Sequence, residues 1–312
     1  MAKRKVAFVT GGAGFIGSNL IRQLLKAGYK VNILLKPETD KWRIKDITSG
    51  LTVYTEDLYH VGKLKSLIER LNPTVIYHLA AYGRSASEVD SQEMIRTNIL
   101  GTHNLLTASK DVAYDAFINT GSSVEYGHKS QSMRETDSCN PDSFYGITKL
   151  AATHMCQIFA REFKKPILTV RPFSVYGPYE DEGRLIPSII AAVLQKEPIQ
   201  LTPKVIRHDY IYVNDLIDAL VKIAQLGNKL GSQIINLGTG REYTNSEVVA
   251  ILFRIMQQKV PVVTGGYKGR SWDSAHWVAD TSLAKELLNW SSTTTLTQGL
   301  TKTVAWVKEN SS

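Results

Sequence analysis

A glycine-rich run near the start of the chain constrains the fold more than any other feature of the sequence. Residues 6–17 read Val-Ala-Phe-Val-Thr-Gly-Gly-Ala-Gly-Phe-Ile-Gly, an apolar stretch typical of a strand followed by closely spaced glycines. Behind the glycines, Leu20, Ile21 and Leu24 continue at helical spacing. This order predicts a seat for a dinucleotide pyrophosphate, because the backbone approaches the phosphates closely and the helix N-terminus faces them. The residues expected to form the seat are Gly11, Gly14, Phe15, Ile16 and Gly17.

The residue after the second predicted strand bears on which dinucleotide is bound. Residues 31–35 read as a strand, and Lys36 follows where NAD enzymes commonly place Asp or Glu for the ribose hydroxyls. Lys41 and Arg43 lie close by in the sequence. Because cations suit a 2′-phosphate, Lys36 is expected to contact one. NADP is therefore the expected cofactor, with NAD as the alternative.

A second motif further along the chain indicates proton transfer. Tyr145 and Lys149 are four residues apart, so a helix would place the phenol and the ammonium on one face. A free tyrosine has a pKa of about 10, and a nearby ammonium favours the phenolate. Ser122 and Ser123 follow a predicted strand, where a hydroxyl suits the reacting oxygen of a substrate, although an ordinary polar turn is the alternative. Beside a dinucleotide, this set indicates acid–base catalysis coupled to hydride transfer.

The order of the elements predicts an α/β fold with a doubly wound parallel sheet of the Rossmann kind. Strands that alternate with helices are expected at residues 31–35, 51–55, 74–78, 116–120 and 166–171. Residues 1–171 are expected to form the dinucleotide-binding domain, with a return segment near 208–240. Residues 172–207 and 241–312 are expected to form a smaller mixed α/β lobe that binds the substrate. Within that lobe, helices are expected near 186–194 and 297–308, and a capping box at Thr244 to Glu247.

Charge, cysteine and hydropathy patterns narrow the class of protein. The net charge is +8, but the basic residues are scattered and form no nucleic-acid motif, so small anionic substrates are favoured over nucleic acid. Cys139 and Cys156 show no metal-ligand spacing, which predicts no metal site and a reducing compartment. Residues 1–5 run directly into the first strand instead of forming a signal peptide, and no apolar stretch approaches a membrane span. A cytoplasmic protein with no membrane partner is expected.

The combined motifs resemble those of the extended short-chain dehydrogenase/reductases, in the superfamily of nucleotide-sugar epimerases, dehydratases and reductases. The resemblance covers nearly the whole chain. Besides the glycine run and the Ser/Tyr/Lys set, the motifs that carry it are His78-Leu79-Ala80-Ala81, Asn98-Ile99-Leu100-Gly101-Thr102, and residues 171–178, 207–215, 270–273 and 287–290.

The resemblance implies roles for individual residues. Ser122, Tyr145 and Lys149 would be catalytic. Further cofactor contacts would come from Asp57 and Leu58 at the adenine, and from Ala80 and Ala81 behind the cofactor. The substrate would be held by Ser123, Ser174, Arg207 and Arg270, the two arginines on its diphosphate because a guanidinium binds such groups bidentately. Family members usually dimerise through helices that flank the tyrosine, so a homodimer is expected.

Departures from the family pattern bear on the reaction. The 4,6-dehydratases usually carry an acid pair directly after the catalytic Thr, where this chain has Ser123 and Val124. Glu125 is displaced by one residue, which on a strand-like segment reverses the direction of its side chain. A dehydratase is therefore disfavoured, and a non-catalytic cofactor sensor is disfavoured because Tyr145 and Lys149 are both present. The expected reaction is reduction of a nucleoside-diphospho-4-keto-6-deoxyhexose. The alternative is a nucleotide-sugar epimerase, similar to UDP-glucose 4-epimerase, with tightly bound NAD.

Overall fold

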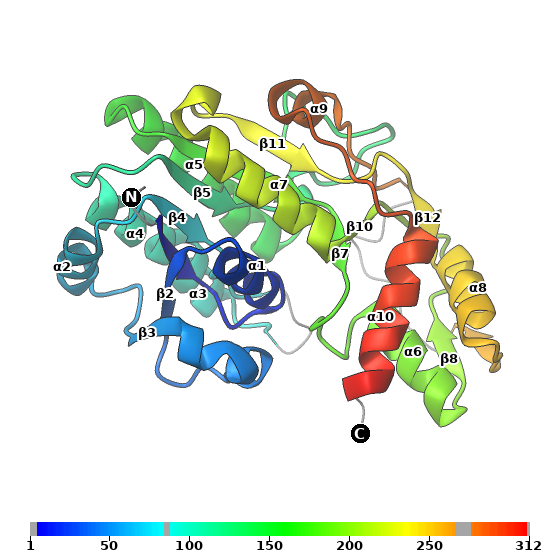
Figure 1. The fold of residues 1–312 in the computed structure, drawn as a ribbon. Helices are drawn as coiled ribbons and strands as arrows, with labels where there is room; N and C mark the ends of the chain where they lie inside the picture. Colours follow the sequence, from blue (N-terminus) through cyan, green and yellow to red (C-terminus); the bar gives the residue numbers. More distant parts are fainter. Residues whose placement is uncertain (1–4, 84–87, 266–275, 311–312) are drawn as a thin grey trace.

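A seven-stranded parallel sheet forms the centre of the molecule (Figure 1), and the computed structural model describes residues 5–83, 88–265 and 276–310. The strand order is β11-β6-β5-β4-β1-β2-β3. Its first six strands in sequence follow the order of a doubly wound dinucleotide-binding sheet, so the predicted α/β fold is confirmed. The strands are β1 (Val6–Thr10), β2 (Lys30–Leu35), β3 (Leu51–Thr55), β4 (Val75–His78), β5 (Ala116–Thr120), β6 (Ile167–Pro172) and β11 (Ile234–Leu237).

Helices cover both faces of this sheet, as the apolar residues of the strands require. In β1, Ala7 and Val9 pack in one core with α1 and α7, whereas Phe8 packs in another with α2, α4 and α5. Alternating side chains of a strand point to opposite faces, so a sheet buried on both faces needs apolar residues at every position. The helices are α1 (Phe15–Lys26), α2 (Val61–Leu71), α4 (Thr102–Ser109), α5 (Phe144–Glu162) and α7 (Val213–Leu226).

Short segments connect these layers. The connecting elements are the 3₁₀ helices η1 (Trp42–Gly50), η3 (Ser123–Tyr126) and η4 (Gly227–Leu230), the helices α3 (Ser91–Met94) and α9 (Ser282–Leu288), and the π-helical stretch η2 (Ile95–Gly101) that runs into α4.

A smaller group of elements stands beside the carboxyl ends of the central strands. In Figure 1, α6, α8, α10 and β8 gather at one side of the main sheet, while β11 returns to pair with β6. The elements outside the main sheet are β7 (Ser174–Tyr176), α6 (Leu185–Gln195), β8 (Ile199–Leu201), β9 (Arg207–His208), β10 (Tyr210–Tyr212), β12 (Tyr243–Thr244), α8 (Asn245–Met256), β13 (Val262–Thr264) and α10 (Leu296–Asn310). The two predicted helices and the Thr244–Glu247 capping box are confirmed.

One local expectation is wrong. The segment after β5 is the 3₁₀ helix η3, not a strand-like stretch. The physical reason is a reciprocal pair of hydrogen bonds: the Glu125 side chain accepts the Ser122 N–H, while the Ser122 side chain accepts the Val124 N–H. This capping box bends the chain immediately after the strand.

Candidate active site

A cavity of about 300 Å³ lies at the carboxyl ends of β1, β4 and β5, where ligands bind in sheets of this kind. Residues of the glycine run and of the Tyr145–Lys149 motif both line it, although the two motifs are more than 100 positions apart in the sequence. The predicted site residues that line it are Gly11, Gly14, Phe15, Ile16, Gly17, Ala81, Ser122, Ser123, Tyr145 and Lys149.

The glycine seat, residues 11–17, has the shape and polarity that a dinucleotide pyrophosphate needs. A Cβ on Gly17 would lie 2.1 Å from the Gly11 carbonyl oxygen, and one on Gly11 would lie 2.5 Å from the Ala80 nitrogen. Gly11 also has a φ of 72°, which favours glycine. No side chain caps the N-terminus of α1, and its first turn holds no acidic residue. The first N–H groups of the helix are thus directed to an anion, and a bound pyrophosphate fits.

Helix α5 carries the predicted acid–base pair. Its N-terminus is capped by Ser143, whose hydroxyl accepts the Gly146 N–H at 3.1 Å. Tyr145 follows in the first turn and Lys149 one turn later, and both line the cavity. Lys149 is only 3% exposed. Burial lowers the pKa of this ammonium, and the negative charge of Glu125 acts in the opposite direction.

The serine turn, Ser122–Tyr126, presents its two hydroxyls differently. The Ser122 oxygen accepts a long hydrogen bond of 3.4 Å from the Val124 N–H, which leaves its own hydrogen available. The Ser123 oxygen accepts a 2.9 Å hydrogen bond from the Trp277 indole N–H in a buried contact. Both serines line the cavity. Trp277 had no assigned role in the sequence, because its contact spans 154 residues.

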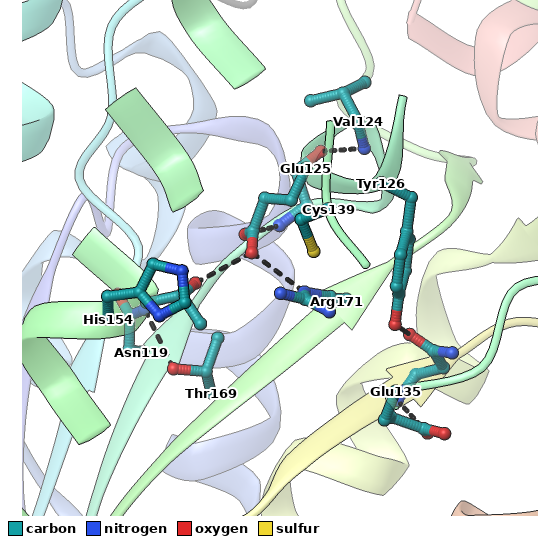
Figure 2. A network of polar contacts seen from close by, with 12 residues as sticks. Asn119, Val124, Glu125, Tyr126, Glu135, Cys139, His154, Thr169 and Arg171 are labelled. Atoms are coloured by element: carbon teal, nitrogen blue, oxygen red, sulfur yellow. Dashed lines mark hydrogen bonds and ion pairs between the residues drawn. The ribbon is translucent and has the colours of Figure 1, made fainter. Parts of the chain in front are cut away.

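Glu125 is completely buried beneath the serine turn (Figure 2). One carboxylate oxygen accepts the Ser122 N–H at 2.8 Å. The other accepts the Thr153 hydroxyl at 2.9 Å and the Arg171 Nε–H at 2.8 Å. Glu125 is not among the residues that line the cavity. The sequence-based conclusion that Glu125 points away from the site therefore holds, although the reason is a tight turn and not strand alternation.

Two buried polar residues, Asn98 and His78, hold elements of the site together. In the sequence they were noted only as members of motifs. The side-chain amide of Asn98 accepts a hydrogen bond from the Tyr82 N–H and donates to both the Tyr82 carbonyl and the Thr148 hydroxyl. Thr148 lies between Tyr145 and Lys149 on α5, so Asn98 ties this helix to the loop after β4. The sequence signal for Asn98 was its motif alone.

His78 links the glycine seat to α4. The Thr102 hydroxyl donates to the Asn98 carbonyl, so His78 Nε2 must donate to Thr102, at 2.9 Å. His78 Nδ1 then accepts from Thr10, at 2.7 Å, and the Thr10 oxygen accepts the Ala80 N–H. Burial lowers the pKa of His78 to about 3, with Lys149 acting in the same direction, so this imidazole is neutral.

Several predicted residues do not line the cavity. Lys36 is exposed directly after β2. Ser174 lies between the lining residues Phe173 and Val175. Arg207 is paired with Glu242, Nε to Oε1 at 3.6 Å. Asp57 and Leu58 form the turn after β3. Ala80 packs behind the glycine seat. Arg270 lies outside the described residues.

Charged residues also line the cavity, and sequence reasoning assigned no site role to Glu180, Asp181 or Arg184. Arg43, Glu180, Asp181 and Arg184 all line it. Arg43 pairs with Asp181 and donates to the Tyr179 carbonyl, so the loop after β2 is joined to the segment before α6. Of the cations that suggested a 2′-phosphate, Arg43 is thus already paired with a carboxylate.

Two other kinds of site are not seen in the part of the chain that the structure describes. No group of three or more His, Cys, Asp or Glu side chains there is placed to hold a metal ion. Among the described residues, no helix is both long and apolar enough to span a bilayer.

Comparisons with known proteins agree with this geometry. The family model for the NAD dependent epimerase/dehydratase family matches residues 7–238. A UDP-glucuronate 4-epimerase from Thermodesulfobacterium geofontis is 30% identical, over 97% of this chain and 96% of the relative. A dTDP-glucose 4,6-dehydratase from Haemophilus influenzae is 26% identical, over 97% and 98%. The crystal structure of UDP-glucuronic acid 4-epimerase from Bacillus cereus, in complex with UDP-glucuronic acid and NAD, superposes with a TM-score of 0.89 at 29% identity, covering 98% of this chain and 99% of that one.

Proposed function

The chain belongs to the NAD-dependent epimerase/dehydratase family, and from this premise we propose that it is a nucleotide-sugar 4-epimerase that works with bound NAD. The sequence favoured reduction of a keto-sugar nucleotide, with epimerisation as the alternative. The relatives support the alternative better, because the epimerases from T. geofontis and B. cereus share 30% and 29% of their residues with this chain.

The observation that carries the proposal is the absence of a usable carboxylate in the serine turn. Elimination of water by a 4,6-dehydratase needs acid–base groups beyond the phenol. In residues 122–126 the one carboxylate is Glu125, and both of its oxygens are occupied by Ser122, Thr153 and Arg171. The cavity keeps Ser122, Tyr145 and Lys149, a set sufficient for moving a single proton on one hydroxyl.

These three residues have complementary tasks in an epimerisation. Tyr145, as phenolate, takes the proton of the sugar 4-hydroxyl and later returns it to the same oxygen. The Lys149 ammonium favours the phenolate form, and the free hydrogen of the Ser122 hydroxyl is donated to the reacting oxygen. NAD, when bound in the glycine seat, supplies the hydride acceptor and then the donor. The sugar leaves with no net oxidation, so no reductant is consumed.

The choice of NAD over NADP rests on two observations. The B. cereus epimerase structure contains NAD. In this chain Arg43 is paired with Asp181 and donates to the Tyr179 carbonyl, so Lys36 and Lys41 are the exposed cations that remain after β2. Exposed ammonium groups are screened by solvent, and they attract a 2′-phosphate more weakly than a guanidinium that is free to bind it bidentately.

The substrate is proposed to be a UDP-hexose or UDP-hexuronate. The B. cereus structure contains UDP-glucuronic acid, and the Arg184 guanidinium, which pairs with Glu180 at 3.8 Å, lines the cavity. Arg207 and Arg270 remain proposed diphosphate contacts. A guanidinium in either place suits the two negative charges of a diphosphate.

A homodimer is proposed from the surface of the helices around the tyrosine. Five apolar side chains on η2 and α5 are 42% to 62% exposed. They are Ile95, Leu100, Phe144, Ile147 and Ile158. Exposed apolar side chains on two helices that pack together are typical of an interface between subunits. A reducing compartment such as the cytoplasm is proposed from Cys139 and Cys156, which are both free.

Two measurements test this function. Mass spectrometry of the small molecules released on denaturation should find NAD in a 1:1 ratio with the protein. UDP-glucose and UDP-glucuronic acid, each incubated with the protein and no added cofactor, should be scored for the 4-epimer by nuclear magnetic resonance. Release of NADP(H), together with NADPH oxidation by a 4-keto sugar nucleotide, would contradict the epimerase and support the reductase.

A further inference from the structure

A buried carboxylate lies where the serine turn, α5 and β6 meet. Glu125 is fully buried, and its three hydrogen-bond partners come from these three elements: Ser122, Thr153 and Arg171. Figure 2 shows the Glu125 carboxylate next to the Arg171 guanidinium, with a dashed line joining the two. A buried charge is costly unless it is paired and fully hydrogen-bonded, as this one is.

The chain makes room for this carboxylate at Gly121. A Cβ there would lie 2.4 Å from a Glu125 carboxylate oxygen. Gly121 also ties the turn to β6, because its N–H donates to the Val170 carbonyl at 2.7 Å. The carboxylate therefore occupies space that is open only because residue 121 has no side chain, directly beneath the backbone that carries Ser122.

On α5 the partner of Glu125 belongs to the same row as the acid–base pair. Tyr145, Lys149 and Thr153 are spaced four residues apart, so they lie on one face of the helix. Thr153 donates to one carboxylate oxygen while Ser122 donates its N–H to the other. The carboxylate thus spans the gap between the turn that holds Ser122 and the row that holds Tyr145.

We propose that Glu125 is a positioning residue, which sets the place of the Ser122 hydroxyl relative to Tyr145 through Thr153 without touching substrate or cofactor. This inference rests on the proposed function for what the two hydroxyls do. The negative charge of Glu125 also raises the pKa of the buried Lys149 ammonium, against the effect of burial. A purely structural ion pair would use the same hydrogen bonds to satisfy the buried carboxylate, so the tests compare turnover and hydrogen exchange with stability.

The mildest test removes only the link to α5. Thr153→Val keeps the shape of the side chain and leaves Glu125 paired with Arg171 and Ser122. We expect kcat to fall about fivefold, the value of one hydrogen bond, with KM for the sugar nucleotide unchanged. Thr153→Ser, which restores the hydroxyl, should recover most of the loss. The matched control is Thr303→Val, because Thr303 is equally buried but bonds only to the Gly299 carbonyl of its own helix.

A second test separates positioning from stability. Glu125→Gln alone leaves the buried Arg171 cation without its charged partner and should lower the melting temperature. It is therefore compared with the double variant Glu125→Met/Arg171→Met. Apolar replacement of both members of a buried ion pair is often neutral for stability. We expect the double variant to regain the wild-type melting temperature but to keep a kcat reduced at least tenfold. Recovery of kcat together with the melting temperature would overturn the proposal.

A third readout needs no substrate. Hydrogen exchange of the peptide that contains residues 122–126 should be faster in Thr153→Val than in wild type and unchanged in Thr303→Val. Equal exchange in all three proteins would overturn the proposal that Glu125 is a positioning residue. If the protein instead turns over none of the sugar nucleotides, only the proposed function is contradicted, and hydrogen exchange still tests the positioning role.

Discussion

The glycine seat and the serine turn face the same cavity, but they are built in opposite ways. In the seat the recognition groups are backbone amides, and the space exists because Gly11 and Gly17 lack side chains. In the serine turn the geometry depends on buried side chains that reach across the fold, such as Glu125 to Arg171. A backbone site is encoded in a few consecutive residues, whereas a side-chain site needs partners that only tertiary structure brings together.

This difference predicts that a substitution among the catalytic side chains lowers kcat without weakening dinucleotide binding, and that a substitution in the glycine seat weakens dinucleotide binding. Tyr145→Phe removes the proton carrier but leaves the glycine seat intact. We expect kcat to fall by about 10³-fold, within the range of general acid–base catalysis, while the dissociation constant of the dinucleotide stays nearly constant. Steady-state kinetics and a fluorescence titration of the cofactor measure the two quantities.

Tyr54→Phe is the matched control, because Tyr54 lies on the edge strand β3 away from the cavity. It should leave both kcat and cofactor affinity unchanged. A tyrosine 145 variant with normal turnover would remove Tyr145 from its proposed role.

The reverse experiment distorts the glycine seat and leaves the serine turn unchanged. The Cβ of Gly17→Ala would lie 2.1 Å from the Gly11 carbonyl oxygen, so the loop must move. We expect the dinucleotide to bind about 100-fold more weakly, since the displaced amides no longer converge on the pyrophosphate. Isothermal titration calorimetry measures this. Gly62→Ala in α2 is the control, because a Cβ there meets nothing within 4 Å. Gly17→Ala should lose much more dinucleotide affinity than Gly62→Ala, and equal affinities in the two variants would refute the backbone seat.

The His78 network runs from Thr10, next to the glycine seat, through Thr102 to Asn98. Asn98 in turn bonds to Thr148 on α5, the helix that carries Tyr145, so a change in this network should affect both cofactor binding and turnover. Thr102→Val removes the acceptor of the His78 Nε2–H and leaves a buried donor unpaired. The free energy of unfolding should fall by about 1–3 kcal/mol, the cost of an unsatisfied buried group. Cofactor affinity and kcat should then decline together, by a few-fold each.

Urea denaturation and the two binding and kinetic assays test this coupling. Thr301→Val serves as the control, because its hydroxyl is exposed and bonds only within α10. A loss of stability with neither kcat nor affinity altered would mean that His78 supports the fold without linking the glycine seat to α5.

The same contrast explains what the sequence could predict. The strands, the seat and the position of the Tyr145–Lys149 pair follow from local patterns: apolar runs, closely spaced glycines and a four-residue spacing. The contacts of Glu125 with Thr153 and Arg171 span 28 and 46 residues, and that of Ser123 with Trp277 spans 154. No spacing rule encodes such pairs. The capping box from Ser122 to Glu125 is local, but a strand-like interpretation of the segment concealed it.

The smallest expected effect concerns a side chain outside the glycine seat. Lys36 is exposed at the end of β2, so its attraction for a 2′-phosphate is screened by solvent. Lys36→Glu should weaken NADP about fivefold, as expected for one exposed charge reversed near a phosphate, and should change NAD affinity little. Lys30→Glu, at the opposite end of the same strand, is the control.

The salt dependence of the Lys36→Glu effect sharpens the comparison. An attraction between exposed charges falls as ionic strength rises, whereas the contacts of backbone amides with a pyrophosphate are shielded from salt by burial. The preference of wild type between NAD and NADP should therefore change with salt, while the loss caused by Gly17→Ala should not. If Lys36→Glu weakens NAD and NADP equally at every ionic strength, Lys36 does not contact the 2′ position, and its charge does not decide between the two dinucleotides.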